Sequence, residues 1–224
     1  MKEESRREKK DRILEKAGSL FLQKGIETTK IIDIARASGV AKGTVYEYFG
    51  SKEEIVADWI QQMFQEFREQ QQKKIAAEKT MQGKLNCFFD HTFEQIEKVT
   101  VVAKIIMERN NERHHIPPLP ISEEAFEKAS ENRIAIVVMD NVRNEIELIQ
   151  EILRDGRAHG EVRSDIDLRF LSYAILSMMP FMGMLKQKPT ADSVREHLRN
   201  QIGIDQTGWS SNDLCRLLLT GIKG

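Results

Sequence analysis

The residues best suited to chemistry lie close together over residues 42–52, and the chemistry they suit is contact with nucleic acid. Lys42 and Lys52 carry positive charges that can pair with phosphates, which receive most of the hydrogen bonds in protein–DNA interfaces. Gly43 permits close approach of the backbone. Hydroxyl groups that can reach phosphates or base edges follow at Thr44, Tyr46 and Tyr48. We expect these side chains on one outward face that carries no large aliphatic residue.

A short helix over residues 42–48 is predicted to carry this face. At about 100° per residue, Val45 and Phe49 fall on the opposite side and must face the core. Ala35 lies four residues before Gly39, so a small side chain and a glycine can form a tight turn ahead of this helix. Two short helices joined in this way make a helix-turn-helix, whose second helix enters the major groove of DNA.

The chain on both sides of this motif is also predicted to be helical, because apolar residues recur at intervals of three and four. A first helix is expected over residues 5–24, with Gly25 ending it. Thr28 and Thr29 are expected to cap the next helix. Ser51 followed by Glu54 predicts a capping box that opens a long helix toward residue 79.

The segment resembles the signature of the TetR family of transcriptional regulators. The matching residues, in the family's order, are Thr29, Ile34-Ala35, Gly39-Val40, Lys42-Gly43-Thr44, Tyr46-Glu47-Tyr48-Phe49 and Ser51-Lys52-Glu53. The resemblance is strong over about residues 11–60, and a weaker match to the family's junction before its dimerisation helices lies at residues 156–167. It implies DNA contacts at Thr29, Lys42, Gly43, Thr44, Tyr46, Tyr48 and Lys52.

The resemblance also implies the architecture. The expected fold is all-α, with a three-helix DNA-binding domain over residues 1–55 and a helical effector-binding and dimerisation domain over residues 56–224. A homodimer is implied because two helix-turn-helix units match a palindromic operator in double-stranded DNA. The helices predicted over residues 165–184 and 191–202 are similar to the family's dimer interface. The first of them is apolar nearly all round, which predicts burial against several neighbours.

Two residues depart from the family pattern. Ala41 stands where a serine or threonine often begins the recognition helix, so a cap is lost at a cost of roughly 0.5–2 kcal/mol. Glu47 is acidic at the centre of the outward face, where phosphates repel it. It can accept a hydrogen bond from cytosine N4 and set specificity, or it can be a solvated side chain, and both interpretations stay open.

The N-terminal arm is basic, and its cations are Arg6, Arg7, Lys9, Lys10 and Arg12. They can reach phosphates or a minor groove, as basic arms do. The alternative is a disordered, solvated tail.

The remaining helices are predicted over residues 81–99, 101–113, 122–159 and 213–222, with a proline-rich break at residues 115–120. An effector pocket is expected among the middle helices. Its candidate lining residues are Phe67, Cys87, Phe88, His91, Met107, Met139, Tyr173 and Met178. Methionine adapts to varied apolar ligands, but Met and Phe at helical spacing equally suit a plain core.

Composition excludes several classes of protein. Because the net charge is −1, any contact with DNA must come from a local basic surface. The sequence has no apolar run long enough to span a membrane and no signal peptide at its start. A cytoplasmic protein is therefore expected. Two distant cysteines and no paired His/Cys spacing indicate neither a disulfide nor a metal, and no cofactor motif is present. No nucleophile–base set supports an enzyme. We therefore expect a dimeric, sequence-specific DNA-binding regulator, a repressor that a small, largely apolar ligand releases from its operator. The alternative is a helix-turn-helix protein that is controlled by a protein partner or has no small-molecule ligand.

Overall fold

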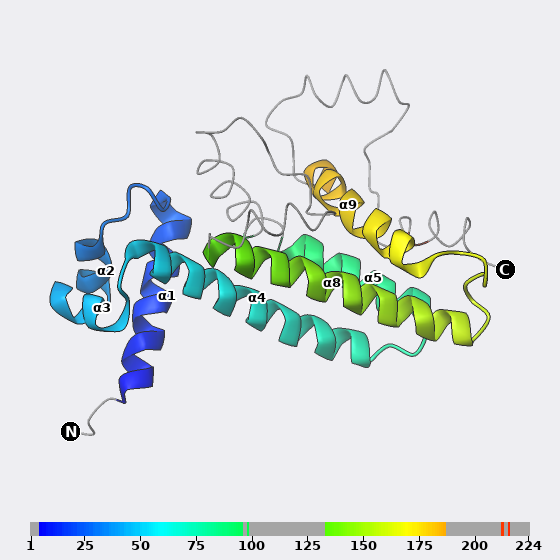
Figure 1. Cartoon of the computed structure of the whole chain (residues 1–224), viewed down its shortest axis with the longest axis horizontal. Helices are drawn as coiled ribbons and strands as arrows, with labels where there is room; N and C mark the ends of the chain where they lie inside the picture. The colour runs from blue at the N-terminus through cyan, green and yellow to red at the C-terminus, as the bar shows by residue number, and fades with distance from the viewer. Residues whose placement is uncertain (1–4, 96–97, 99–132, 187–211, 213–214, 216–224) are drawn as a thin grey trace, which may run out of the picture. The chain divides into compact units, whose positions relative to one another are not determined.

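The computed structural model describes residues 5–95, 98, 133–186, 212 and 215. This part of the chain is all-α, as predicted (Figure 1). Its helices are α1 (Arg6–Lys24), α2 (Ile31–Ala37), α3 (Lys42–Tyr48), α4 (Lys52–Ala76), α5 (Met81–Glu94), α8 (Arg133–Ala158) and α9 (Leu168–Lys186). None of these described helices is long and apolar enough to cross a membrane.

The chain forms two compact units. The first holds Met1–Phe67 and Glu97–Asn141, and the second holds Arg68–Ile96 and Val142–Gly224. Both α4 and α8 therefore contribute residues to each unit. The predicted domain boundary at residue 55 does not coincide with a border of these compact units, and it stays a prediction.

The first unit has a core made by α1, α2, α3, the first half of α4 and the start of α8. Its fully buried side chains include Ile13, Ala17, Phe21, Ile34, Val45, Phe49, Ile55 and Ile60. Val45 and Phe49 anchor α3 in this core, which confirms the prediction from their spacing. Full burial of a valine, isoleucine or phenylalanine side chain stabilises the fold by about 1.5–3 kcal/mol.

The start of α1 is fixed by a capping box. The Ser5 hydroxyl accepts from the Glu8 N–H at 3.1 Å, and the Glu8 carboxylate accepts from the Ser5 N–H at 2.8 Å. Gly25, at φ 85°, ends the helix and donates its N–H to the Phe21 carbonyl. The basic residues from Arg6 onward thus belong to a helix, and the interpretation of this segment as a disordered tail is wrong.

Gly18 brings α1 into direct contact with α4. A Cβ at this position would lie 2.1 Å from Trp59 Nε1, so only glycine leaves room for the indole. The same indole meets the ring of Phe21 edge to face, with centroids 5.4 Å apart. This close approach holds the first helix against the helix that follows the helix-turn-helix.

The start of α2 differs from the prediction. Its N-cap is Lys30, whose N–H donates to the Asp33 carboxylate at 3.1 Å. The hydroxyl of Thr28 donates to the Lys24 carbonyl, and that of Thr29 donates to the Gly25 carbonyl at 2.7 Å. Both threonines therefore close the end of α1, where carbonyls lack helical partners, instead of capping α2.

Ser51 caps α4 as predicted, because its hydroxyl accepts from the Glu54 N–H at 3.1 Å. The Glu54 carboxylate, however, accepts from the N–H of Gly50 at 2.9 Å and not from Ser51. The reciprocal half of the box is thus shifted by one residue, onto Gly50, which precedes Ser51. The helix then ends at Ala76, slightly before the predicted end.

The second unit has its own core, formed by the end of α4, α5, most of α8 and α9. Its fully buried side chains include Met81, Leu85, Phe88, Phe89, Ile149, Leu153 and Ile175. Gly156 lets α8 approach α5, since a Cβ there would lie 2.1 Å from the Met81 sulfur. Gly160, at φ 76°, follows the end of α8 as predicted.

A single chain provides part of the burial predicted for α9, and burial against a partner stays a prediction. Phe170 is 74% exposed, although Leu171, Ile175 and Met179 on the same helix are buried. Up to residue 179, α9 therefore has one buried and one exposed face within this chain. The predicted helices at 101–113, 191–202 and 213–222, and the break at 115–120, lie outside the continuous described segments.

Candidate nucleic-acid interface

The turn between α2 and α3 is tightly bonded. Gly39 adopts φ 66°, a conformation that favours glycine, and Val40 donates its N–H to the Ala35 carbonyl at 3.0 Å. The buried Ser38 hydroxyl donates to the Ile34 carbonyl at 2.7 Å. With Val45 held in the core, these bonds orient α3 as the second helix of a helix-turn-helix.

The outward face of α3 carries most of the predicted contacts. Lys42, Gly43, Tyr46 and Glu47 are exposed, and Thr44 is half-buried. A Cβ at Gly43 would meet nothing within 4 Å, so packing within the chain does not require glycine there. The open space at this position is available to a partner. Ala41 is the N-cap without a side-chain hydrogen bond, as its residue type predicted.

Two cations lie over the tyrosine rings of α3. Lys42 Nζ is 5.8 Å from the centroid of Tyr46, and the Arg6 guanidinium is 5.7 Å from that of Tyr48. Tyr48 is half-buried and packs against the core of the first unit. Arg6 of α1 thus lies beside the last residue of α3.

Thr29 and Lys52 are placed differently from the other predicted contacts. The side chain of Thr29 is 0% exposed and its hydroxyl is bonded to Gly25, so a direct side-chain contact with DNA is ruled out in this conformation. Lys52 is half-buried at the start of α4, with Nζ 3.4 Å from the Glu27 carbonyl. Its ammonium remains near the helix-turn-helix, and a phosphate contact there stays a prediction.

An ion-pair group behind α3 was not predicted. Asp58 of α4 is 8% exposed and pairs with Lys10 of α1 at 2.8 Å and with Arg133 of α8. Arg133 also pairs with Glu54 at 3.2 Å, and Lys10 Nζ lies 5.2 Å from the ring of Phe49. These contacts tie α1, α4 and α8 together at the C-terminal end of the recognition helix. Asp58 lies within an apolar helical stretch, which is the sequence signal that could have revealed it.

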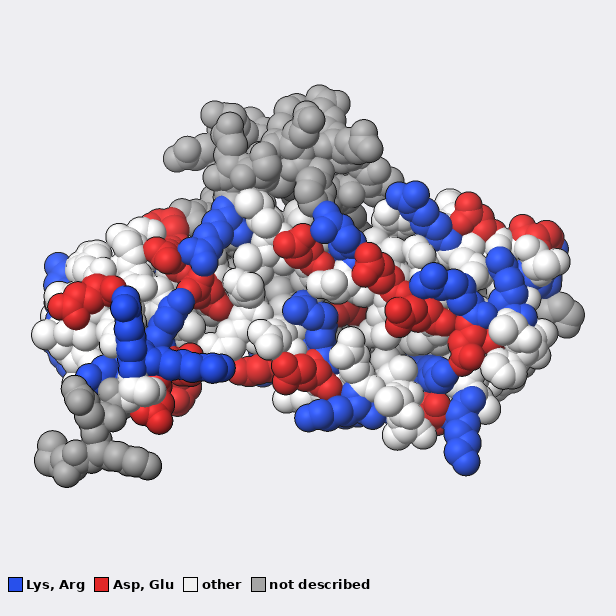
Figure 2. Space-filling model, turned by 60° about the horizontal axis from the view of Figure 1, so that its bottom comes forward, with Lys and Arg blue, Asp and Glu red and all other residues white. Residues whose placement is uncertain are grey.

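Over most of the face in Figure 2, basic side chains lie among acidic ones, and several basic side chains gather at the end that holds the N-terminus. Arg12 donates to the Ser38 carbonyl at 3.0 Å, and Lys10 is paired with Asp58, so both serve the fold. Contact with a polyanion must therefore depend on individually placed cations, as the net charge implied.

The predicted effector residues are divided between the two units. Phe67 and Met139 belong to the first unit, and Met107 lies outside the described residues. Phe88 and His91 are buried in the second unit, where Cys87 and Met178 pack against its core and Tyr173 is half-buried. Burial lowers the pKa of His91 and raises that of Cys87. That these residues line one pocket stays a prediction.

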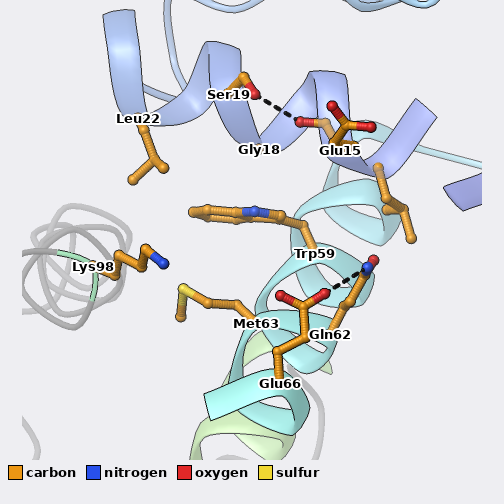
Figure 3. A pocket seen from close by; sticks show the side chains of 10 residues that line it. Glu15, Gly18, Ser19, Leu22, Trp59, Gln62, Met63, Glu66 and Lys98 are labelled. Atoms are coloured by element: carbon orange, nitrogen blue, oxygen red, sulfur yellow. Dashed lines mark hydrogen bonds between the residues drawn. The ribbon is translucent and has the colours of Figure 1, made fainter. Parts of the chain in front are cut away.

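A cavity of about 190 Å³ lies between α1 and α4 in the first unit. Figure 3 shows the indole of Trp59 between Leu22 and Met63, with the carboxylates of Glu15 and Glu66 at the rim. The other lining residues are Leu14, Gly18, Ser19, Gln62 and Lys98. None of the predicted effector residues is among them, so this cavity is distinct from the predicted effector site.

The family model for bacterial regulatory proteins of the tetR family matches residues 13–58, the segment that contains α2 and α3. The repressor KstR2 of Mycobacterium tuberculosis is 26% identical over 163 residues, 70% of each chain. The fatty acid metabolism regulator protein of Bacillus subtilis is 21% identical over 220 residues, 97% of each chain. The crystal structure of FadR from Bacillus subtilis in complex with stearoyl-CoA has the same fold, with a TM-score of 0.61 and 20% identity over 95% of this chain and 98% of that one.

The matched segment, the relatives and the geometry all indicate a helix-turn-helix formed by α2 and α3. The family model covers the anchoring residues Val45 and Phe49 and the exposed face of α3, and the two relatives are named as a transcriptional repressor and a fatty acid metabolism regulator. No enzyme is among these relatives. Over residues 13–58 the chain has the helix-turn-helix segment of the TetR family, and over most of its length it is similar to a named transcriptional repressor and a named metabolism regulator.

Proposed function

We propose that this regulator is a homodimer that binds a palindromic operator with one α3 helix from each protomer in the major groove. The observation that carries the proposal is the outward face of α3, where Lys42, Gly43 and Tyr46 are exposed while Val45 fixes the helix from behind. One helix-turn-helix buries little surface on DNA, so two copies are needed for tight and specific binding.

The proposed contacts divide into two kinds. Lys42 and Lys52 bind phosphates and position the protein, while Thr44, Tyr46, Tyr48 and Glu47 approach base edges or the adjoining backbone. Gly43 allows the backbone to lie close to the DNA. Glu47 is proposed as a specificity residue through cytosine N4.

A small and largely apolar ligand is proposed to release the protein from its operator in the cytoplasm. Two similarities support this part: the relative named KstR2 is a repressor, and a solved relative binds stearoyl-CoA, which has a long apolar chain. Release requires that the ligand bind two conformations of the dimer unequally. The alternative, control by a protein partner or by no small molecule, shares the same DNA-binding face.

Fluorescence anisotropy on DNA from upstream of the gene tests both parts. The protein should bind with a stoichiometry of two chains per site, and sedimentation should give a dimer without DNA. Saturating stearoyl-CoA, used as the probe, should lower operator affinity. Operator binding that persists unchanged with this and related acyl thioesters would favour the alternative.

A further inference from the structure

Two buried polar side chains face one another in the second unit. Gln71 of α4 is 0% exposed and Glu145 of α8 is 6% exposed. Gln71 Nε2 donates to Glu145 Oε2 over 3.4 Å, which is a long hydrogen bond. The single oxygen of Gln71, Oε1, and the other carboxyl oxygen of Glu145, Oε1, are buried without a hydrogen-bond partner.

These two oxygens are out of place in their surroundings. Ile75 on α4 and Ile146 and Ile149 on α8 are buried close to them along the same helices. Polar atoms that lose water on folding are nearly always hydrogen-bonded, because an unpaired buried acceptor is unfavourable. Two such atoms, contributed by one pair of side chains, offer two hydrogen-bonding partners to a polar group bound beside them.

The protonation of Glu145 decides which group fits. Burial is the main cause that raises its pKa to about 7, opposed by the Gln71 hydrogen bond and by the charge of Arg68 on α4. Near neutral pH the carboxyl therefore exists in both forms, and its neutral form has an O–H to donate. His91 of α5 is also buried, but the charges that act on it are Lys74 and Glu94, and its pKa lies below the ordinary value.

We propose that Gln71 and Glu145 bind a hydroxyl group of an otherwise apolar small molecule. A hydroxyl can accept from the neutral Glu145 carboxyl and donate to Gln71 Oε1, so one group satisfies both atoms. An ether or ester oxygen can only accept and leaves Gln71 Oε1 unpaired. An amine would bind the ionised carboxylate instead. The inference rests on the proposal that this chain binds a small molecule, and it names a polar feature of that molecule.

Three probes with the same apolar chain separate these head groups: 1-decanol, decyl methyl ether and decylamine. Calorimetric titration of the full chain at pH 6 should show 1-decanol binding roughly fivefold more tightly than the ether, about the effect of one hydrogen bond. Because the hydroxyl needs neutral Glu145, decanol affinity should fall about tenfold between pH 6 and pH 8.

Two substitutions at Glu145 test the assignment. Glu145→Gln keeps a donor, so it should retain the preference for the alcohol but lose its pH dependence. Glu145→Leu should bind alcohol and ether equally. Glu147→Gln is the matched control, because Glu147 is exposed on the same helix, and it should behave like wild type.

The contrary results are equally distinct. Absence of decanol binding, equal affinity for alcohol and ether in wild type, or an alcohol preference that survives in Glu145→Leu would overturn the proposal. Tighter binding of decylamine, strengthening as the pH rises, would replace the hydroxyl site by a cation site. Operator binding by the same preparations is measured separately, so a failed ligand experiment leaves the DNA-binding proposal independently tested.

Discussion

The buried carboxylate of Asp58 pairs with the guanidinium of Arg133, the first residue of α8, with Oδ1 and Nη2 2.5 Å apart. Lys10 approaches the other carboxylate oxygen at 2.8 Å. Asp58 thus joins the first and fourth helices to α8 directly behind the recognition helix. Because its side chain is only 9% exposed, its charge needs both cations as partners.

Asp58→Asn should lower the free energy of unfolding by about 1–3 kcal/mol. Loss of a buried ion-pair partner usually costs 3–5 kcal/mol, but Arg133 and Lys10 are partly exposed and can regain water. Urea denaturation measures the change. Asp11→Asn, at an exposed position of α1, should shift stability by less than about 0.5 kcal/mol, and an equal effect of both substitutions would contradict a special role for Asp58.

Gly18→Ala should lower the stability of the fold, whereas Gly43→Ala should not. A methyl group at Gly18 collides with Trp59 and should destabilise the fold by about 1–3 kcal/mol. A methyl group at Gly43 meets nothing, so it should leave stability equal or raise it by up to about 1 kcal/mol, since alanine favours helix.

The effect of Gly43→Ala on operator affinity should differ from its effect on stability. Gly43→Ala should weaken it at least tenfold if the backbone of α3 lies close to DNA. Thermal denaturation and anisotropy on the same samples compare the two properties. Full operator affinity in Gly43→Ala would show that the open space at Gly43 is not occupied by DNA.

Lys42→Ala should weaken binding to all DNA sequences by a similar factor. A phosphate contact releases counterions, so its loss should flatten the slope of log affinity against log salt by about one. Titrations between 50 and 200 mM salt, conditions that resolve such slopes, measure this. Lys24→Ala is a suitable control because Lys24 is paired with Asp33 at 2.7 Å, and it should leave the slope unchanged.

Glu47→Gln should change the relative affinities for operator variants more than the mean affinity. The carboxylate accepts from cytosine N4, while an amide can also donate and so favours adenine, with a difference of about 1–3 kcal/mol at the contacted base. Competition among single-base operator variants provides the measurement. Unchanged ratios across all positions would leave Glu47 as a solvated side chain.

Stability should fall as the pH rises from about 4.5 to about 7. Burial raises the pKa of Glu145 from 4.5 to about 7, so in this interval the folded state binds more protons than the unfolded state. Ionisation of Glu145 should lower the free energy of unfolding by about 3 kcal/mol, and the full loss is reached above pH 7. Glu145→Gln should remove this part of the dependence in urea titrations, and an unchanged pH profile would contradict the buried, elevated pKa.

The helix-turn-helix could be predicted because residues close together in the sequence determine it. Val45 and Phe49 define the buried side of α3 by spacing alone, and Gly39 marks the turn, so the bounds of α3 agree with the prediction. Caps were harder, because Thr28, Thr29 and Glu54 each have several backbone groups within reach, and packing chooses among them.

Contacts between distant segments could not be predicted in this way. The Asp58 ion pairs and the Gln71–Glu145 pair join residues more than 40 positions apart. The spacing of apolar residues along the sequence does not indicate which distant residues come into contact. Helical spacing also does not distinguish an apolar residue that faces a partner from one that faces the core, and Phe170 is exposed within one chain. The candidate effector residues rest on residue type alone, which does not distinguish a pocket from a core.

The most direct test of the central claim is a footprint of the full-length protein on DNA upstream of its gene, compared with the Lys42→Ala/Tyr46→Ala double variant. We predict protection of a palindromic segment whose half-sites lie about one helical turn apart, and its loss in the variant with the fold unchanged. No sequence-specific protection by wild type, or the same protection by the variant, would contradict an operator-binding role for α3.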